Sequence, residues 1–171
     1  MTDTERSRRR SYRIADNFLS FYLGVLSRYR AEIDRGLGPS ILPVLVESLD
    51  DALGSPYEAA FRNHLRGMAV SGALGPEPVV ALGPFWTDDG QNEIDAVALA
   101  GRARRPVLVG EAKWTRSVDG ARLAAVLSQK ARALPGGRHD GLRRVVCARS
   151  EVRSAPDDVL ALTAVDLFPD P

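Results

Sequence analysis

Three charged residues interrupt the two most apolar runs of the chain, and their types suit hydrolytic chemistry. Asp95 lies inside "EIDAVAL", and Glu111 and Lys113 lie inside "VLVGEAKW". An uncompensated charge buried in a strand costs several kcal/mol or forces the group to become neutral. These positions therefore indicate either a functional site or a compensated ion pair.

A predicted hairpin brings the three residues together. The segment "GRARRP" separates the two runs, and a turn centred on Ala103 pairs residues whose numbers add to 206. Asp95 and Glu111 meet this condition, so we expect their Cβ atoms about 4.5–5.5 Å apart. Lys113 follows Glu111 by two residues on one strand, so both side chains point to the same face.

Two carboxylates this close repel each other unless a cation lies between them. A hard divalent cation, Mg²⁺ or Mn²⁺, binds such oxygen ligands and completes its shell with water and phosphate oxygens. The ion lowers the pKa of its bound water, so that the water loses a proton and can attack a phosphodiester. Lys113 would orient that water or stabilise charge on the phosphate. The spacing predicts metal-assisted hydrolysis with Asp95 and Glu111 as metal ligands. The alternative is two acids that face solvent, with Lys113 in a surface ion pair.

The chain divides into three parts. Residues 1–11 are polar and basic, which is typical of a flexible tail, or of an arm that contacts phosphates. Residues 12–54 form a helical extension: one helix is capped by Asp16, carries an aromatic stripe and ends at "RGLGP", and a second covers "SILPVLVESLDDALG". The remaining residues, 55–171, carry the charged hairpin.

The order of elements in residues 55–171 predicts an α/β fold with a mixed sheet. Ser55 as N-cap and Glu58 in a capping box start a helix whose apolar face is Tyr57, Phe61 and Leu65. Three strands, a helix and a further strand follow, and then a short helix and an edge strand. In order, they are "EPVVALGPFW", "NEIDAVALA", "RPVLVGEAKW", "SVDGARLAAVLSQKARAL", "RRVVCA", "APDDVLAL" and "AVDLF".

Composition excludes several kinds of site. The single cysteine, Cys147, cannot form an intramolecular disulfide or a thiolate zinc cluster, and its apolar surroundings predict a buried thiol. His64 and His139 lack a metal-ligand spacing. No signal peptide or membrane span is recognisable, so we expect a cytoplasmic protein without membrane contact.

A net charge of +1 neither requires nor excludes nucleic-acid binding, because the placement of charge matters more than its sum. Arg116 and Lys130 follow the E-x-K strand and would contact phosphates, or they are solvated surface charges. Trp86 and Trp114 flank the acidic strands and either pack against helices or stack on a base.

"EIDAVAL" and the E-x-K of "GEAKW" resemble the PD-(D/E)XK nuclease superfamily. Within it, the chain is most similar to the nuclease-like domain of unknown function at the C-terminus of archaeal-type AAA ATPases. The similarity extends from Tyr12 to Ala148. The segments that carry it are "YRIADNFLSFYL", "SPYEAAFRNHL", "FWTDDGQNEIDAVAL" and "GEAKW".

The resemblance implies a restriction-endonuclease-like fold and a Mg²⁺- or Mn²⁺-dependent endonuclease, with DNA favoured as substrate. It also implies that Glu58 joins Asp95, Glu111 and Lys113 in the catalytic site, where the capping box is the competing role for Glu58. Gln129 and Lys130 match a region that contacts substrate in some relatives, and a solvated helix face is the other interpretation.

The chain departs from that family in one respect, because it contains no G-x-x-x-x-G-K-[ST] loop and no winged-helix segment. We therefore expect a free-standing domain, a partner of an ATPase supplied in trans, or the remnant of a shortened gene. The alternative to a nuclease is a catalytically inactive module that binds nucleic acid or protein. The sequence leaves the oligomeric state open.

Overall fold

The computed structural model describes residues 14–87, 89–135 and 141–169, and these residues divide into two compact units, the first ending at Ala52 and the second beginning at Leu53. The predicted tail, residues 1–11, and His139 lie outside the described residues. Within the described residues, no helix has the length and apolarity needed to cross a membrane.

The first unit is helical, as predicted, but its first helix is interrupted. The Asp16 carboxylate caps α1 (Asn17–Gly24) by accepting the Leu19 N–H at 2.7 Å. The predicted single helix then divides at Gly24 and the β-branched Val25, which are weak helix formers. The pieces that follow are η1 (Leu26–Tyr29), α2 (Arg30–Glu32), η2 (Ile33–Leu37) and α3 (Gly38–Ala52).

No side chain in these helical pieces is buried among the described residues. Phe18 of the predicted aromatic stripe is 71% exposed and stacks on Tyr22.

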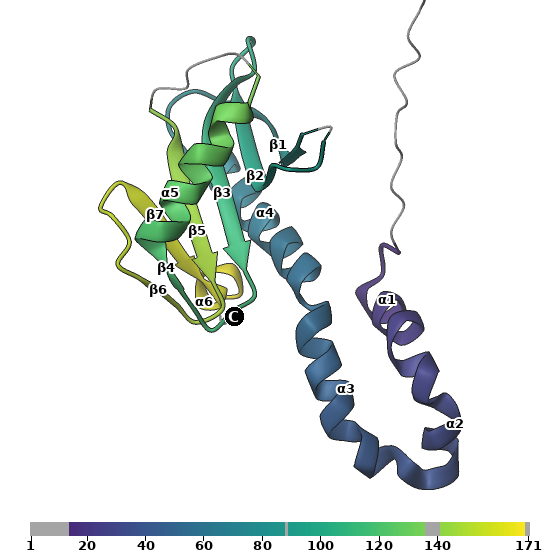
Figure 1. The fold of residues 1–171 in the computed structure, drawn as a ribbon. Coiled ribbons are helices and arrows are strands. Elements are labelled where there is room, and N and C mark those ends of the chain that lie inside the picture. The colour runs from purple at the N-terminus through teal and green to yellow at the C-terminus, as the bar shows by residue number, and fades with distance from the viewer. Residues whose placement is uncertain (1–13, 88, 136–140, 170–171) are drawn as a thin grey trace, which may run out of the picture. The chain divides into compact units, whose positions relative to one another are not determined.

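The second unit is a five-stranded mixed sheet with helices on both faces (Figure 1). The strand order is β1-β2-β3-β5-β7, in which β1, β2 and β3 are antiparallel and β3, β5 and β7 are parallel. These strands are β1 (Val79–Trp86), β2 (Glu93–Ala100), β3 (Arg105–Lys113), β5 (Arg143–Ala148) and β7 (Val159–Thr163). A small second sheet pairs β4 (Ser117–Asp119) with β6 (Glu151–Arg153).

Helix α4 (Gly54–Val70) covers one face of the sheet with Tyr57, Phe61 and Leu65, all buried as predicted. Helix α5 (Gly120–Lys130), extended by η3 (Ala131–Ala133), covers the other face and packs Leu127 against Val97 and Val109. The mixed α/β class and the order helix, three strands, helix, strand are confirmed.

Two local predictions were wrong. Helix α4 begins at Gly54 and no side chain caps it, so the capping box with Ser55 and Glu58 does not form. At the C-terminus, the "APDDVLAL" segment contributes strand β7, and the segment "AVDLF" contributes helix α6 (Ala164–Leu167). Asp166 makes a capping box with Thr163, which starts α6 where an edge strand was expected.

Candidate active site

Strands β2 and β3 pair in the predicted register at the end that carries the acids. Ala96 lies opposite Gly110, and Val97 lies opposite Val109, as the constant of 206 requires. An irregularity after Ala98 shifts the pairing by one residue only toward the turn. The paired residues end at Ala96 and Gly110, each one residue from an acid, Asp95 on β2 and Glu111 on β3.

Both acids are buried. Asp95 is 5% exposed and Glu111 is 2% exposed, although strand acids commonly face solvent. The Asp95 Oδ2 atom accepts the Ala112 N–H at 2.8 Å. Burial raises the pKa of Asp95, as does the nearby charge of Glu111, and the Ala112 hydrogen bond offsets this only in part.

Lys113 shares a face with Glu111, as the two-residue spacing predicts. Its ammonium lies 2.8 Å from Glu111 Oε1, and its side chain is 44% exposed. Burial works to lower the pKa of Lys113, but the hydrogen bond and charge of Glu111 outweigh burial and leave that pKa raised. Lys113 is therefore a charged group that reaches from a buried carboxylate to solvent.

A second lysine contacts the same carboxylate. Lys130, the last residue of α5, donates to Oε1 of Glu111 at 2.9 Å and to Oε2 at 3.0 Å. From the sequence, Lys130 was expected to contact nucleic acid or to lie on a solvated helix face. Because Lys130 follows Leu127 by three residues, both lie on the sheet-facing side of α5, and this spacing was the missed signal.

Helix α4 adds Glu58 and Arg62 to the site. Arg62, which sequence reasoning missed, is 8% exposed and donates to the backbone carbonyl of Asp95 at 3.0 Å. Glu58 lies 3.8 Å from Arg62, and its pKa is raised by burial and by the charge of Asp95. Glu58 therefore lies near enough to Asp95 for the two charges to interact. The i,i+4 spacing to Glu58 was the signal for Arg62.

The other residues predicted to contact nucleic acid lie away from the acids and their cations. Gln129 is exposed on α5, and Arg116 is exposed in the loop between β3 and β4. Of the two interpretations for the tryptophans, packing holds for Trp114, which lies edge-on against Tyr57 with Arg149 over its ring. Trp86 is 62% exposed at the end of β1.

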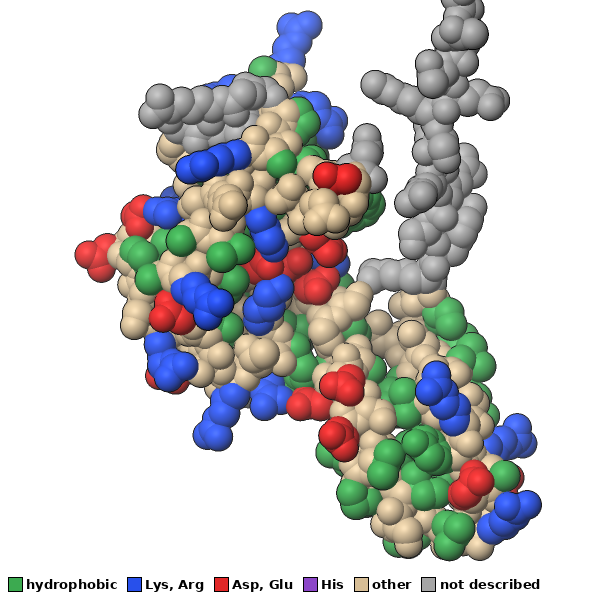
Figure 2. Space-filling model, viewed as in Figure 1, with side chains coloured by type: hydrophobic (Ala, Val, Ile, Leu, Met, Phe, Trp, Pro, Cys, Tyr) green, Lys and Arg blue, Asp and Glu red, His purple; other side chains and the backbone are tan. Residues whose placement is uncertain are grey.

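Three cations contact the acids of this region. Lys113 and Lys130 contact the Glu111 carboxylate, and Arg62 contacts the Glu58 carboxylate and the backbone carbonyl of Asp95. Acidic and basic side chains intermingle in the same way on the face of the unit in Figure 2. The formal charges cancel, which explains how the fold tolerates two buried acids without a metal ion.

The donor set accommodates one magnesium ion of the usual kind. Among the described residues, no three His, Cys, Asp or Glu side chains are grouped closely enough to enclose a metal. Mg²⁺ needs no such cage, since it commonly uses one or two carboxylates and keeps several waters. Asp95 and Glu111 suffice for this mode, provided that Glu111 exchanges a lysine contact for the ion.

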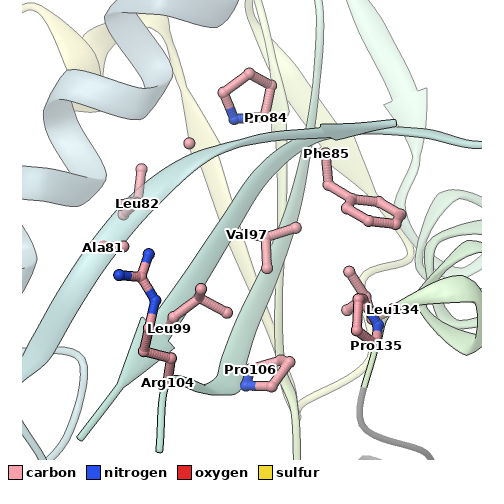
Figure 3. Close-up of a pocket in the computed structure, with 11 residues that line it drawn as sticks. Ala81, Leu82, Pro84, Phe85, Val97, Leu99, Arg104, Pro106, Leu134 and Pro135 are labelled. Atoms are coloured by element: carbon pink, nitrogen blue, oxygen red, sulfur yellow. The ribbon is translucent and has the colours of Figure 1, made fainter. Parts of the chain in front are cut away.

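A separate cavity of about 380 Å³ lies between β1, β2, β3 and the end of η3 (Figure 3). Its lining is apolar apart from Arg104, and it includes Phe85, Val97 and Leu134. This composition offers no ligand for a hard cation, so the acid cluster is the better candidate site.

Comparison with protein families gave one match. The model of a family named DUF234 and described as "Archaea bacterial proteins of unknown function" matches residues 22–129. No curated protein and no solved structure matches the chain. The family match covers more than half of the 171 residues and includes Glu58, Asp95, Glu111 and Lys113, so the chain belongs to this family.

Proposed function

We propose that this member of an archaeal and bacterial family of unknown function is a metal-dependent nuclease-like domain that hydrolyses phosphodiester bonds, with DNA as the favoured substrate. The observation that carries the proposal is the buried pair Asp95 and Glu111, with Lys113 bonded to Glu111. Burying two acids side by side is costly, and divalent-cation binding is a function that repays that cost.

The fold supports the proposal. Three antiparallel strands, a crossover helix and a parallel strand are the arrangement that resemblance to PD-(D/E)XK nucleases implies. We therefore assign the second unit to the restriction-endonuclease-like fold as part of the proposal. In this arrangement Asp95 and the E-x-K residues come from the two neighbouring strands β2 and β3.

Asp95 and Glu111 would hold Mg²⁺ or Mn²⁺, and Glu58 of α4, whose pKa is raised by the charge of Asp95, would add a ligand directly or through water. When bound, the ion would supply an acidified water as nucleophile. The Ala112 N–H fixes the orientation of Asp95. Lys113, partly exposed, would donate to a phosphate oxygen and stabilise charge that develops there.

One observation favours a second candidate, a catalytically inactive module that binds nucleic acid or an ATPase supplied in trans. The six charged groups already balance, and two lysines hold the carboxylate that the metal requires. Such a cluster is stable without a metal ion and would be retained in a domain that has lost catalysis.

A cleavage assay separates the two candidates. Purified protein would be incubated with Mg²⁺ or Mn²⁺ and with plasmid DNA, single-stranded DNA or RNA, beside Asp95→Asn, Lys113→Met and Glu93→Gln. Glu93 is the matched control, because it is an exposed acid on the same strand as Asp95. We expect the first two variants to lose about 100-fold or more of the rate and Glu93→Gln to keep it.

Equal cleavage by all four proteins would indicate a contaminant and would refute the nuclease. Salt-dependent DNA binding by the parent without metal-dependent cleavage would favour the binding module.

A further inference from the structure

Lys130 occupies both oxygens of the carboxylate that the proposed metal needs. Its Nζ atom lies 2.9 Å from Oε1 and 3.0 Å from Oε2 of Glu111, and the Lys113 ammonium lies 2.8 Å from Oε1. Moving Lys113 away would therefore leave both oxygens still bonded to Lys130.

A divalent cation and the Lys130 ammonium would bind the same lone pairs of the Glu111 carboxylate oxygens. Mg²⁺ binds carboxylate oxygens at about 2.0–2.1 Å, which is closer than the ammonium of Lys130. An ammonium that bridges both oxygens would then lie a few ångströms from the ion, and like charges at that distance repel strongly where water is scarce. Glu111 is buried, so the two cations compete for it.

Lys130 is able to leave this position. Its side chain is 23% exposed and extends from the end of α5 on a flexible stem, so it can turn to solvent without moving the backbone. Arg62 has no such freedom, because its side chain is 10% exposed and bonded to the backbone carbonyl of Asp95.

We propose that Lys130 is a positioning residue that holds the Glu111 carboxylate in the metal-free domain and competes with a divalent cation for it. The inference rests on the proposed function, since the cation belongs to that proposal. It adds a property that the proposed nuclease site does not itself require: metal affinity is reduced by a side chain of the same site.

Calorimetric titration of the full chain with Mn²⁺ tests the inference without any substrate. Lys130→Met keeps the apolar stem and removes the charge, and Lys130→Arg restores a cation that pairs with carboxylates. Arg122→Met is the matched control, because it removes an exposed cation from the same helix. We expect at least a fivefold lower Kd for Lys130→Met, a Kd no lower than the parent's for Lys130→Arg, and a Kd within twofold of the parent's for Arg122→Met.

Thermal unfolding gives a second readout. Without metal, the midpoint of Lys130→Met should fall below that of the parent, because Glu111 loses two hydrogen bonds. Saturating Mn²⁺ should raise the midpoint of Lys130→Met by more than it raises that of the parent. If Lys130→Met does not fold, Lys130→Gln serves for both measurements.

An unchanged or weaker Mn²⁺ affinity in Lys130→Met would overturn the inference, as would a lack of Mn²⁺ binding by parent and variant alike. The two proposals fail separately. If Lys130→Met binds Mn²⁺ more tightly than the parent but the parent cleaves no substrate, the competition is supported and the nuclease is refuted. If the parent cleaves substrate and its Mn²⁺ affinity equals that of Lys130→Met, the nuclease is supported and the competition is refuted.

Discussion

The Asp95 carboxylate accepts the backbone N–H of Ala112, the residue between Glu111 and Lys113, at 2.8 Å. One hydrogen bond therefore links the acid of β2 to the E-x-K segment of β3. Asp95 has a structural role as well as the role of metal ligand that we propose, and amide and apolar replacements distinguish the two.

Asp95→Asn should keep the fold and Asp95→Ala should weaken it. The asparagine oxygen still accepts the Ala112 N–H, and the amide removes a carboxylate whose raised pKa shows that its charge is unfavourable. Alanine leaves the N–H without that acceptor, which costs about 1–3 kcal/mol. We expect urea unfolding to give Asp95→Asn a stability equal to or above that of the parent at pH 7, and both variants to lose Mn²⁺ binding. Equal stabilities for the two variants would contradict the structural role.

Gly110→Ala should destabilise the fold by about 1–3 kcal/mol. A Cβ atom at Gly110 would lie 2.8 Å from Cζ of Phe61, which is fully buried. Gly83→Ala is the control, since a Cβ atom there meets nothing within 4 Å. Chemical denaturation should show little change or a small gain for Gly83→Ala. If both glycines accept alanine equally well, α4 does not pack on β3 as closely as described.

Cys147→Ala should make the stability less sensitive to high pH. Burial raises the pKa of the Cys147 thiol from 9.0 to about 11, so only the unfolded chain loses this proton between those two values. The contribution of the protonated thiol to the free energy of unfolding is fully present below pH 9, and it falls by about 2–3 kcal/mol as the pH rises to about 11. Urea unfolding at pH 8 to 11 should show a smaller fall for Cys147→Ala. Tyr57, which donates to the Ala148 carbonyl at 2.6 Å and whose pKa is also raised, keeps some pH dependence in both proteins. If the stability of Cys147→Ala falls with pH as steeply as that of the parent, the Cys147 thiol does not cause the pH dependence.

Glu58→Gln should stabilise the protein at neutral pH. Burial and the charge of Asp95 raise the pKa of Glu58, so its ionised form is less favourable in the folded chain than in the unfolded chain. The resulting loss of stability is present at neutral pH and vanishes as the pH falls through the ordinary value of 4.5. Thermal melts at pH 7 and pH 4 should therefore show a gain for Glu58→Gln at pH 7 that disappears at pH 4. A loss at pH 7 would show that the ion pair with Arg62 outweighs burial.

The sequence predicted part of the hairpin register. Ala96 pairs with Gly110 and Val97 with Val109, as the constant of 206 requires, although the pairs beside the turn are shifted by one residue. The spacing of two also placed Lys113 on the same face as Glu111, which its ammonium contacts. The same reasoning placed Phe61 on the buried face of α4, because a helix repeats its face every three to four residues.

Other features depended on packing between distant segments. The spacing from Leu127 indicates that Lys130 lies on the sheet-facing side of α5, but which strand residue it contacts depends on how α5 packs on the sheet. The "APDDVLAL" segment is a short apolar run, and such runs fit a helix or a strand equally well until a neighbour such as β5 pairs with them. Ser55 resembled an N-cap, but the helix begins one residue before it.

The short connection between β2 and β3 has a consequence for how the chain folds. Hairpins close within microseconds, whereas a parallel crossover requires a longer loop to close and forms later. The two acids therefore come together before α5 can deliver the Lys130 ammonium, and until then Lys113, which belongs to the same hairpin, is the cation that offsets the charge of Glu111.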